Sequence, residues 1–442
     1  MGSEALPVQT KGIFHSLPTF SPDIKDLTAI VTGANGISGF HTMRVLLESP
    51  QRWTKVWAAS RRPPPKEMMD LLPPEHRERV EHVACDFLTE PEDIARQLKA
   101  KGITDVDAVF FYSYLQPKPK PGAPVWSNAQ ELVDTNCKLN TALLRNFLGA
   151  LEHAKITPKR FLLQTGAKDY GIHLGPIRTP AVESDPRVTL EPNFYYPQED
   201  MLFQYCQKTG AHWNVICPAW VIGAVNNAAM NALHPLAVYA AVQAHKGEKL
   251  EYPGDLAAWL APGEHSTAML TGYLSEWAVL EDRCKDQKFN ASDTCLLPNN
   301  RLWPELARWY GCKGSGGPEL DDSKLSTIDP GDVPTPLGYG PPTKMRYSFT
   351  LSKWAEAEVN HKAWQEIMKQ HNLSHNPFED VEAHFMFGDY AALGSTLLSM
   401  NKARCFGWTG HVDTLESLHK AYGELNLIKM LPPLVADARP LM

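Results

Sequence analysis

Residues 27–39 read LTAIVTGANGISG, an apolar run followed by three glycines, Gly33, Gly36 and Gly39, and then by a helical pattern. The short apolar run suits a strand that is buried on both faces of a parallel sheet. Glycines at this spacing permit a tight turn and a close approach of the backbone to a ligand. A helix that begins at such a turn directs its free amides at an anion, so the segment predicts a pyrophosphate-binding strand–turn–helix.

Strand-like and helix-like segments alternate on both sides of this turn, which is typical of a parallel sheet wrapped by helices. The expected strands are Leu27–Thr32, Lys55–Ser60, Val80–Cys85, Ala108–Tyr114, Arg160–Thr165 and Trp213–Pro218, with helices at Gly39–Glu48 and Leu132–Leu151. Crossovers between parallel strands are right-handed, so these elements predict one sheet. The predicted fold class is α/β, a doubly wound parallel Rossmann-type sheet.

The pattern changes near residue 225. Long helical segments follow, including Met230–His245, Arg301–Tyr310 and Leu351–Met368, and the Gly- and Pro-rich stretch Gly311–Arg346 predicts a long loop. We therefore expect a dinucleotide-binding domain over residues 1–225 and a smaller, mainly helical C-terminal substrate lobe over residues 226–442. A strand near residues 286–292 is a candidate to return to the main sheet.

The composition excludes several classes of function. A net charge of −7 gives no basic face for nucleic acid, and the longest apolar stretch, Val215–Val225, is too short to cross a bilayer. The eight cysteines form no CxxC pair, and His371 and His375 lack an evident third ligand, so we expect no metal. A cytosolic protein with a small-molecule substrate, neither membrane-bound nor bound to nucleic acid, is expected. The sequence leaves a homodimer open.

The end of the second expected strand distinguishes between two dinucleotides. An NAD site places an acidic residue about 20 positions after the glycines, where it holds the ribose hydroxyls. This chain has Ser60, Arg61 and Arg62 there. Guanidinium groups attract a 2′-phosphate, so NADPH is the predicted cofactor, although two solvated surface arginines are the alternative. Asp86, at the end of the third strand, is a candidate partner for the adenine amino group, with a helix cap or a surface charge as the alternatives.

Two further segments carry a resemblance to a known family. Residues 162–170 read LLQTGAKDY and residues 192–200 read PNFYYPQED. Together they resemble the progesterone 5β-reductase/iridoid synthase group of atypical extended short-chain dehydrogenases (PRISE-type), which show LQTGxKxY and NFYYxxED. The likeness also covers VFFYSY at residues 109–114 and HPLAVYAAVQAHKG at residues 234–247. Three segments depart from the family: Tyr114 stands where it has a tryptophan, CPAW at residues 217–220 replaces an RPG-type segment, and the loop Gly311–Arg346 is longer than the family leads us to expect.

The resemblance implies a catalytic pair, Tyr195 and Lys168. Glu199, four residues after the tyrosine, would raise the pKa of the phenol, so we expect the Lys168 ammonium to lower it. Tyr195 would then hydrogen-bond the substrate oxygen while hydride reaches an enone or a carbonyl. The plain structural alternatives are a surface-loop lysine for Lys168 and buried aromatic residues at a helix start for Tyr195 and Tyr196. The remaining predicted cofactor contacts are Gly33, Asn35, Gly36, Ile37, Gly39, Ser60, Arg61, Arg62, Asp86, Phe87, Ser113, Thr165, Pro218 and Val221; the predicted pocket residues are Tyr114, Tyr196, Trp220 and Met230.

The expected function is an NADPH-dependent reductase of the short-chain dehydrogenase/reductase superfamily that acts on a small apolar substrate, with secondary metabolism as a weaker expectation. An isomerase, epimerase or cyclase on the same scaffold is the first alternative. A regulator that senses NADP(H) is the second, and the retained Lys168 and Tyr195 argue against it. The three departures from the family lie near the expected pocket, so the family's substrate is not transferred to this chain.

Overall fold

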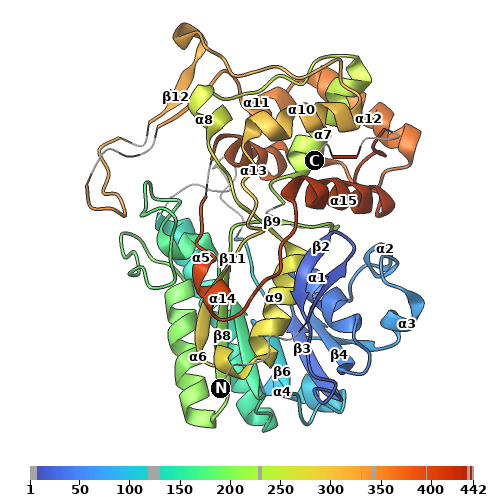
Figure 1. The fold of residues 1–442 in the computed structure, drawn as a ribbon, viewed down its shortest axis with the longest axis vertical. Helices are drawn as coiled ribbons and strands as arrows, with labels where there is room; N and C mark the ends of the chain where they lie inside the picture. The colour runs from blue at the N-terminus through green and yellow to red at the C-terminus, as the bar shows by residue number, and fades with distance from the viewer. Residues whose placement is uncertain are drawn as a thin grey trace.

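The computed structural model describes residues 7–117, 130–226, 231–329, 331–339, 342, 344–394, 396–435 and 439–440. Figure 1 shows two tiers, a sheet with flanking helices below and a cluster of helices above. None of the helices within these ranges combines the length and the apolar character that crossing a membrane requires.

The lower tier is built on a seven-stranded sheet in the order β11-β8-β7-β6-β3-β4-β5, with every neighbouring pair parallel. Its strands are β3 Leu27–Thr32, β4 Trp53–Ser60, β5 Val80–Ala84, β6 Ala108–Phe111, β7 Arg160–Gln164, β8 His212–Pro218 and β11 Gln287–Ala291. The first six lie where the sequence predicted them, and the doubly wound Rossmann-type class is confirmed. Strand order reverses between β3 and β6, which is where such sheets bind ligands.

Helices cover both faces of the sheet. On one face lie α4 Pro91–Ala100, α5 Gln130–Ala154 and α6 Tyr195–Thr209; on the other lie α1 Ile37–Leu47 and α9 Ala268–Leu280. Helix α9 was not predicted, because its sequence is apolar on nearly every side and shows no amphipathic period. It packs closely on α1, where a Cβ added to Gly272 would lie 3.0 Å from Val45 Cγ2.

Several late segments return to the lower tier. Strand β11 pairs with β8, at the position where a returning strand was a candidate, and α14 Asn401–Cys405 packs against β11. Near the N-terminus, β1 Val8–Lys11 and β2 Phe14–Pro18 form an antiparallel hairpin, and its Phe14 and Leu17 pack in the same core as α1 and α9. A separate pair of short strands, β9 Trp220–Ile222 and β10 His265–Thr267, is parallel. The sheet therefore draws on residues from both halves of the chain.

The upper tier is mainly helical, as expected, around a core that buries Trp303, Trp309 and Trp364 completely. Its helices are α7 His234–Lys246, α8 Leu256–Leu260, α10 Asn299–Tyr310, α11 Leu351–Ala355, α12 Glu358–His371, α13 Val381–Leu393 and α15 Thr414–Leu427. The prediction of a single helix over Leu351–Met368 is wrong, because the helix is interrupted between α11 and α12. The Asn360 side-chain amide donates to the Trp354 carbonyl, which lies at the end of α11, at 2.7 Å. Short elements complete the fold: α2 Lys66–Met69, α3 Pro74–Arg77, η1 Ala167–Tyr170, η2 Asp282–Cys284, η3 Asp322–Lys324 and η4 Pro377–Asp380.

The stretch Gly311–Arg346 is mostly loop, as predicted, but not wholly irregular. It holds β12 Ser326–Ile328, which pairs antiparallel with β13 Met345–Tyr347. Near its middle, Thr335 is buried against Gly175, in the loop that follows β7. The long loop thus contacts the carboxyl end of the sheet.

Candidate functional site

The glycine turn after β3 leaves no room for side chains. Gly33 has a φ of +61°, and a Cβ there would lie 2.8 Å from the Tyr112 carbonyl oxygen. A Cβ on Gly39 would lie 2.4 Å from the carbonyl oxygen of Gly33, closer than any real contact. Gly36 is the N-cap residue of α1, and no side chain of the described residues caps the helix. The first-turn amides, which include that of Ile37, therefore have no side-chain partner and face the position that a pyrophosphate would take.

The two predicted arginines lie in an exposed segment after β4 that is hydrogen-bonded to the glycine turn. The Asn35 side-chain amide donates to the Arg62 carbonyl at 2.8 Å, and the Ser60 hydroxyl donates to the same carbonyl at 2.7 Å. Arg61 and Arg62 are both exposed, and neither forms an ion pair within the described part of the chain. Two guanidinium groups beside the glycine turn fit the 2′-phosphate of NADP(H).

Unsatisfied polar atoms lie at the carboxyl end of β7. Gln164 donates from Nε2 to the Ser38 hydroxyl in the first turn of α1 at 2.8 Å, but its Oε1 is buried and has no hydrogen-bond partner among the described residues. The Thr165 hydroxyl is also buried and has no hydrogen-bond partner within the same part of the chain. Buried polar groups are normally hydrogen-bonded, so these atoms, the uncapped α1 and the close-packed glycines together fit a bound dinucleotide.

Other predicted cofactor residues hold local structure as well. One carboxylate oxygen of Asp86 accepts from the Leu88 amide at 3.0 Å, so it caps a local turn and not a helix, while its second oxygen has no such bond among the described residues. The Phe87 ring packs in the core against Phe147 with centroids 5.0 Å apart, so its side chain is not offered to a ligand as predicted. Of the remaining three, Ser113 follows the end of β6, Pro218 is the last residue of β8, and Val221 is the middle residue of β9.

The expected catalytic residues come from two segments that meet. Lys168 lies in η1, immediately after β7, and Tyr195 is the first residue of α6. The Tyr195 hydroxyl lies 3.0 Å from the position of a Cβ on Gly166, two residues before Lys168. Asn193 joins the segments directly: its Nδ2 donates to the Lys168 carbonyl at 3.0 Å, and its Oδ1 accepts from the Tyr195 amide at 3.1 Å. Asn193 lies within the PNFYYPQED segment, but no role was predicted for it.

The charge state of the pair differs from the expectation. Burial raises the pKa of Tyr195 well above its ordinary value, and Tyr114, Cys217 and Asp169 raise it further. The predicted lowering of the phenol pKa is therefore wrong, because desolvation of the phenolate outweighs any nearby cation. Burial also lowers the pKa of Lys168. The Tyr195 hydroxyl keeps its proton and can act as a hydrogen-bond donor.

A buried ionic network fixes the two segments against the sheet. The Lys288 ammonium, on β11, contacts Asp169 Oδ2 and lies 2.9 Å from Glu199 Oε1. Arg187 lies 2.9 Å from the other oxygen of Glu199 and 2.8 Å from Asp200. Glu199 therefore neutralises two cations and is not aimed at the phenol. Lys288 was not predicted at this site, because only the pairing of β11 with β8 brings it close to Asp169 and Glu199.

Two of the four predicted pocket residues stay near the pair. The Tyr114 ring stacks on Phe194 with centroids 5.8 Å apart, and burial raises the pKa of its hydroxyl to about 12. Trp220 is half-buried in β9, next to the end of β8. Tyr196 instead has a structural role: its ring is buried and its hydroxyl donates to the Asp169 carbonyl at 2.8 Å, so it does not line a pocket as predicted. Met230 lies outside the described residues.

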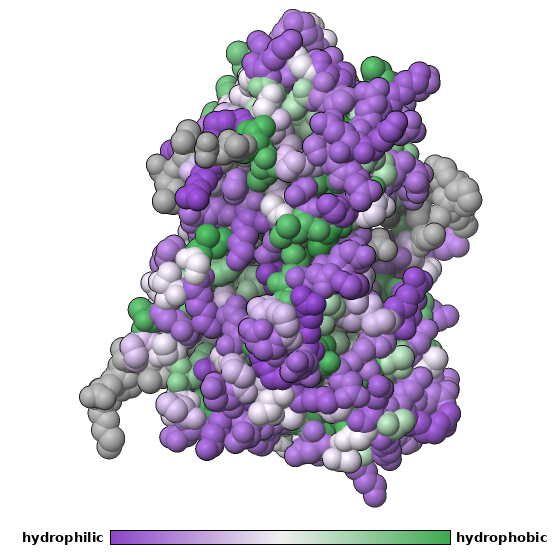
Figure 2. All heavy atoms as spheres, turned by 90° about the vertical axis from the view of Figure 1, so that its right-hand side faces the viewer, coloured by the Kyte–Doolittle hydropathy of each residue, from purple (hydrophilic) through white to green (hydrophobic). Residues whose placement is uncertain are grey.

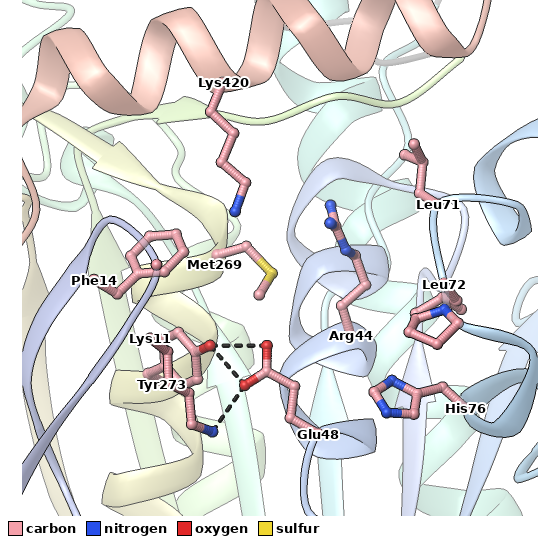
Figure 3. A pocket seen from close by; sticks show the side chains of 12 residues that line it. Lys11, Phe14, Arg44, Glu48, Leu71, Leu72, His76, Met269, Tyr273 and Lys420 are labelled. Atoms are coloured by element: carbon pink, nitrogen blue, oxygen red, sulfur yellow. Dashed lines mark hydrogen bonds and ion pairs between the residues drawn. The ribbon is translucent and has the colours of Figure 1, made fainter.

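A separate cavity of about 310 Å³ opens at the far end of α1, at the junction of the tiers (Figure 3). Figure 2 views the molecule from the right-hand side of Figure 1 and shows hydrophobic side chains gathered in a hollow at this junction. Lys11 and Tyr273 both contact Glu48 in the cavity wall, at 2.8 Å and 2.7 Å. The lining contains none of the predicted site residues: it consists of Lys11, Gly12, Phe14, Arg44, Glu48, Leu71, Leu72, Pro73, His76, Met269, Tyr273 and Lys420.

The described residues contain no group of three His, Cys, Asp or Glu side chains that could hold a metal ion. His375, considered above with His371, has its ring centroid 5.3 Å from that of His234 and 5.1 Å from that of His384. Burial lowers the pKa of His234 to about 3 and that of His375 to about 4, so these packed rings stay neutral near pH 7.

This chain is similar to known proteins along 91% of its length. A family model described as a PRISE-like Rossmann-fold domain matches residues 29–330. The (S)-8-oxocitronellyl enol synthase CYC2 of Camptotheca acuminata is 29% identical, over 91% of this chain and 93% of its own. The 3-oxo-Delta(4,5)-steroid 5-beta-reductase of Arabidopsis thaliana is 26% identical over similar shares, 91% and 93%. A solved UDP-glucose 4-epimerase shares the fold, with a TM-score of 0.50, 12% identity and coverage of 67% of this chain and 86% of that chain.

Proposed function

Because this chain belongs to the PRISE-like Rossmann-fold family, we propose that it is an NADPH-dependent reductase that delivers hydride to an enone or a carbonyl of a small apolar substrate. The observation that carries the proposal is the meeting of Tyr195 and the Lys168 segment beside an uncapped, close-packed glycine turn. The relatives with assigned names support it, since a 3-oxo-Δ4,5 steroid, the substrate class in one of those names, is an enone.

The proposed chemistry divides simply between the cofactor and this chain. A bound reduced nicotinamide would supply the hydride. The Tyr195 hydroxyl, which burial keeps protonated, would donate a hydrogen bond to the substrate oxygen as negative charge grows on it. Such a donor is strongest in a water-poor site, and Tyr195 is enclosed by Gly166 and Phe194. Lys168 would hold the nicotinamide side of the cofactor, and Asn193 would keep the two catalytic residues in register.

NADPH is proposed over NADH because of the exposed corner at Arg61 and Arg62. A 2′-phosphate placed there would gain two cations that are not committed to other ion pairs within the described residues. No carboxylate stands in the Ser60–Arg62 segment to hold a ribose diol in its place.

The first test follows NADPH oxidation at 340 nm with purified protein and a panel of apolar enones and ketones. Tyr195→Phe should lower kcat by at least about a hundredfold, the usual scale for loss of a positioned proton donor. Tyr205→Phe is the matched control, because Tyr205 lies on the same helix and its hydroxyl makes only a long bond of 3.4 Å to the Ile156 carbonyl. Binding of NADPH without any product from the panel would overturn the proposal and favour a sensing role.

A second candidate, enol-forming or cyclising chemistry without net reduction, uses the same donor. It is favoured by the similarity to an enol synthase and by a phenol that remains neutral beside the expected oxyanion. Product formation with no net loss of absorbance at 340 nm would select it over the reductase.

A further inference from the structure

The cavity at the far end of α1 combines an apolar wall with a few charged groups (Figure 3). Phe14, Leu72 and Met269 line it, and all three belong to the buried core. Its volume of about 310 Å³ lies at the lower end of the range for ligand pockets, roughly 300–1,000 Å³. An apolar body that displaces water from such a wall gains free energy in proportion to the area it covers.

Two of the three Lys and Arg side chains that line the cavity are already neutralised. The Lys11 ammonium lies 2.8 Å from Glu48, a carboxylate that also accepts from the Tyr273 hydroxyl at 2.7 Å. The Arg44 guanidinium donates to both oxygens of Glu424, at 2.8 Å each. These two ion pairs therefore add no net charge to the wall of the cavity.

The third cation, Lys420, differs from these two. It points from α15 into the cavity, toward Met269 and Arg44 (Figure 3), and its ammonium lies 5.1 Å from the centroid of the Phe14 ring. It forms no ion pair with any described residue, and Glu424, one turn further along α15, is the carboxylate that Arg44 holds. With three cations against two carboxylates, the cavity keeps one positive charge beside its apolar wall.

The cavity is separate from the residues proposed to bind the cofactor and to carry the reaction. Helix α1 begins beside the glycine turn and rises about 1.5 Å per residue, so Glu48 lies about 16 Å along its axis from Ile37. Neither Lys168 nor Tyr195 is among the lining residues. A ligand in this cavity would therefore leave the dinucleotide and the reacting groups uncovered.

We propose that this cavity binds a small apolar acid, whose carboxylate contacts Lys420. Its hydrocarbon body would lie between Phe14 and Met269 on one side and Leu71 and Leu72 on the other. A single cation without an ion-pair partner in the described part of the chain favours a monoanion over a neutral or cationic molecule. The apolar wall favours hydrocarbon over a sugar or a peptide. The site shares no residue with the proposed catalytic pair, so its occupancy is independent of the reductase assignment.

The test is a calorimetric titration of the purified protein with straight-chain carboxylates from hexanoate to dodecanoate. Affinity should rise about fourfold with each added methylene, the effect of burying one such group, and should stop rising once the chain fills the cavity. Octan-1-ol and octyltrimethylammonium should bind about fivefold more weakly than octanoate, the upper end of the effect of an exposed ion pair, because neither presents a negative charge to the ammonium.

Three variants locate the bound acid. Lys420→Met should remove the preference for octanoate over octan-1-ol and leave the binding of the alcohol nearly unchanged. Lys402→Met is the matched control, because Lys402 also lies over a phenylalanine ring, that of Phe289 at 5.4 Å, but does not line the cavity. Met269→Trp should fill the cavity and abolish the binding of both compounds. Thermal melting of each variant shows whether it is folded.

The outcomes separate this proposal from the proposed function. No binding of any acid in the series, or unchanged octanoate binding in folded Lys420→Met, would overturn the proposal even if the enzyme reduces enones. Displacement of octanoate by NADPH would also overturn it, because the acid would then occupy the cofactor site. A plateau in the chain-length series, a lost preference for the acid in Lys420→Met and retained binding beside NADPH would support it even if no substrate in the panel is reduced.

Discussion

Replacing Lys288 with methionine removes the ammonium that Asp169 and Glu199 share, while nearly preserving the volume of the side chain. Both carboxylates are buried, with side chains 4% and 5% exposed, and Lys288 itself is 16% exposed. Breaking a buried ion pair from one side typically costs about 3–5 kcal/mol, because the remaining charge stays desolvated. We expect a loss of this size in the free energy of unfolding at pH 8, a large share of the roughly 5–15 kcal/mol of a typical domain.

The loss should depend on pH in a defined direction. Burial already raises the pKa of Asp169 above its unfolded value, and removal of the ammonium raises it further. The folded variant therefore binds more protons than the unfolded chain, so its stability is highest in acid and falls as the pH rises through the folded pKa. Urea unfolding followed by tryptophan fluorescence should show a smaller deficit at pH 5.5 than at pH 8.

A control variant and a triple variant test whether the loss of stability comes from the buried charges. Lys402→Met is the control, because Lys402 is half-buried over the Phe289 ring at 5.4 Å but forms no ion pair within the described residues. It should cost much less than Lys288→Met. The triple variant Asp169→Asn, Lys288→Met, Glu199→Gln, which removes all three charges, should recover much of the loss. Equal losses of unfolding free energy for Lys288→Met and Lys402→Met, or no recovery of stability in the triple variant, would refute the claim that this ionic network fixes the two segments against the sheet.

Two other expectations follow from single sites. Arg61→Ala combined with Arg62→Ala should weaken NADPH binding at least about tenfold while leaving NADH binding nearly unchanged, as measured by titration of cofactor fluorescence; equal losses for both cofactors would contradict the role of this corner. Burial raises the pKa of Asp293 to about 7, so its contribution to stability is fully present below its unfolded pKa and is lost as the pH rises to about 7. Asp293→Asn should therefore flatten the dependence of the melting temperature on pH between 5 and 7, and an unchanged slope would show that another group titrates.

The sheet was predictable because its strands are short, continuous and buried on both faces. Strand β6, for example, is an unbroken apolar run from Ala108 to Phe111 and is fully buried. The glycine turn was equally clear, since Gly33 and Gly39 each occupy a position that rejects any side chain. Helix α9 escaped prediction for the opposite reason, because a helix buried on nearly every side has no polar face to mark its period.

The site was predictable only in part. The segments that carry Lys168 and Tyr195 could be quoted from the sequence, but the groups that hold them come from distant positions. Lys288 reaches the site through the pairing of β11, and Glu191 pairs with His173 across a loop. Neither contact has a local pattern, since ion pairs between remote segments depend on the completed fold. Tyr196 shows the converse error, because a side chain predicted to line the pocket instead anchors the backbone at Asp169 through its hydroxyl.

The late arrival of β11 has a consequence for how the protein is made. Until residues Gln287–Ala291 have left the ribosome, β8 is an open edge with unpaired amides and carbonyls, and the nascent sheet offers it to any other extended chain. Lys288 arrives with the same strand, so Asp169 and Glu199 also wait for their cation. A fragment that stops near residue 225 should therefore aggregate or recruit chaperones, although it contains the entire glycine turn and both predicted catalytic residues.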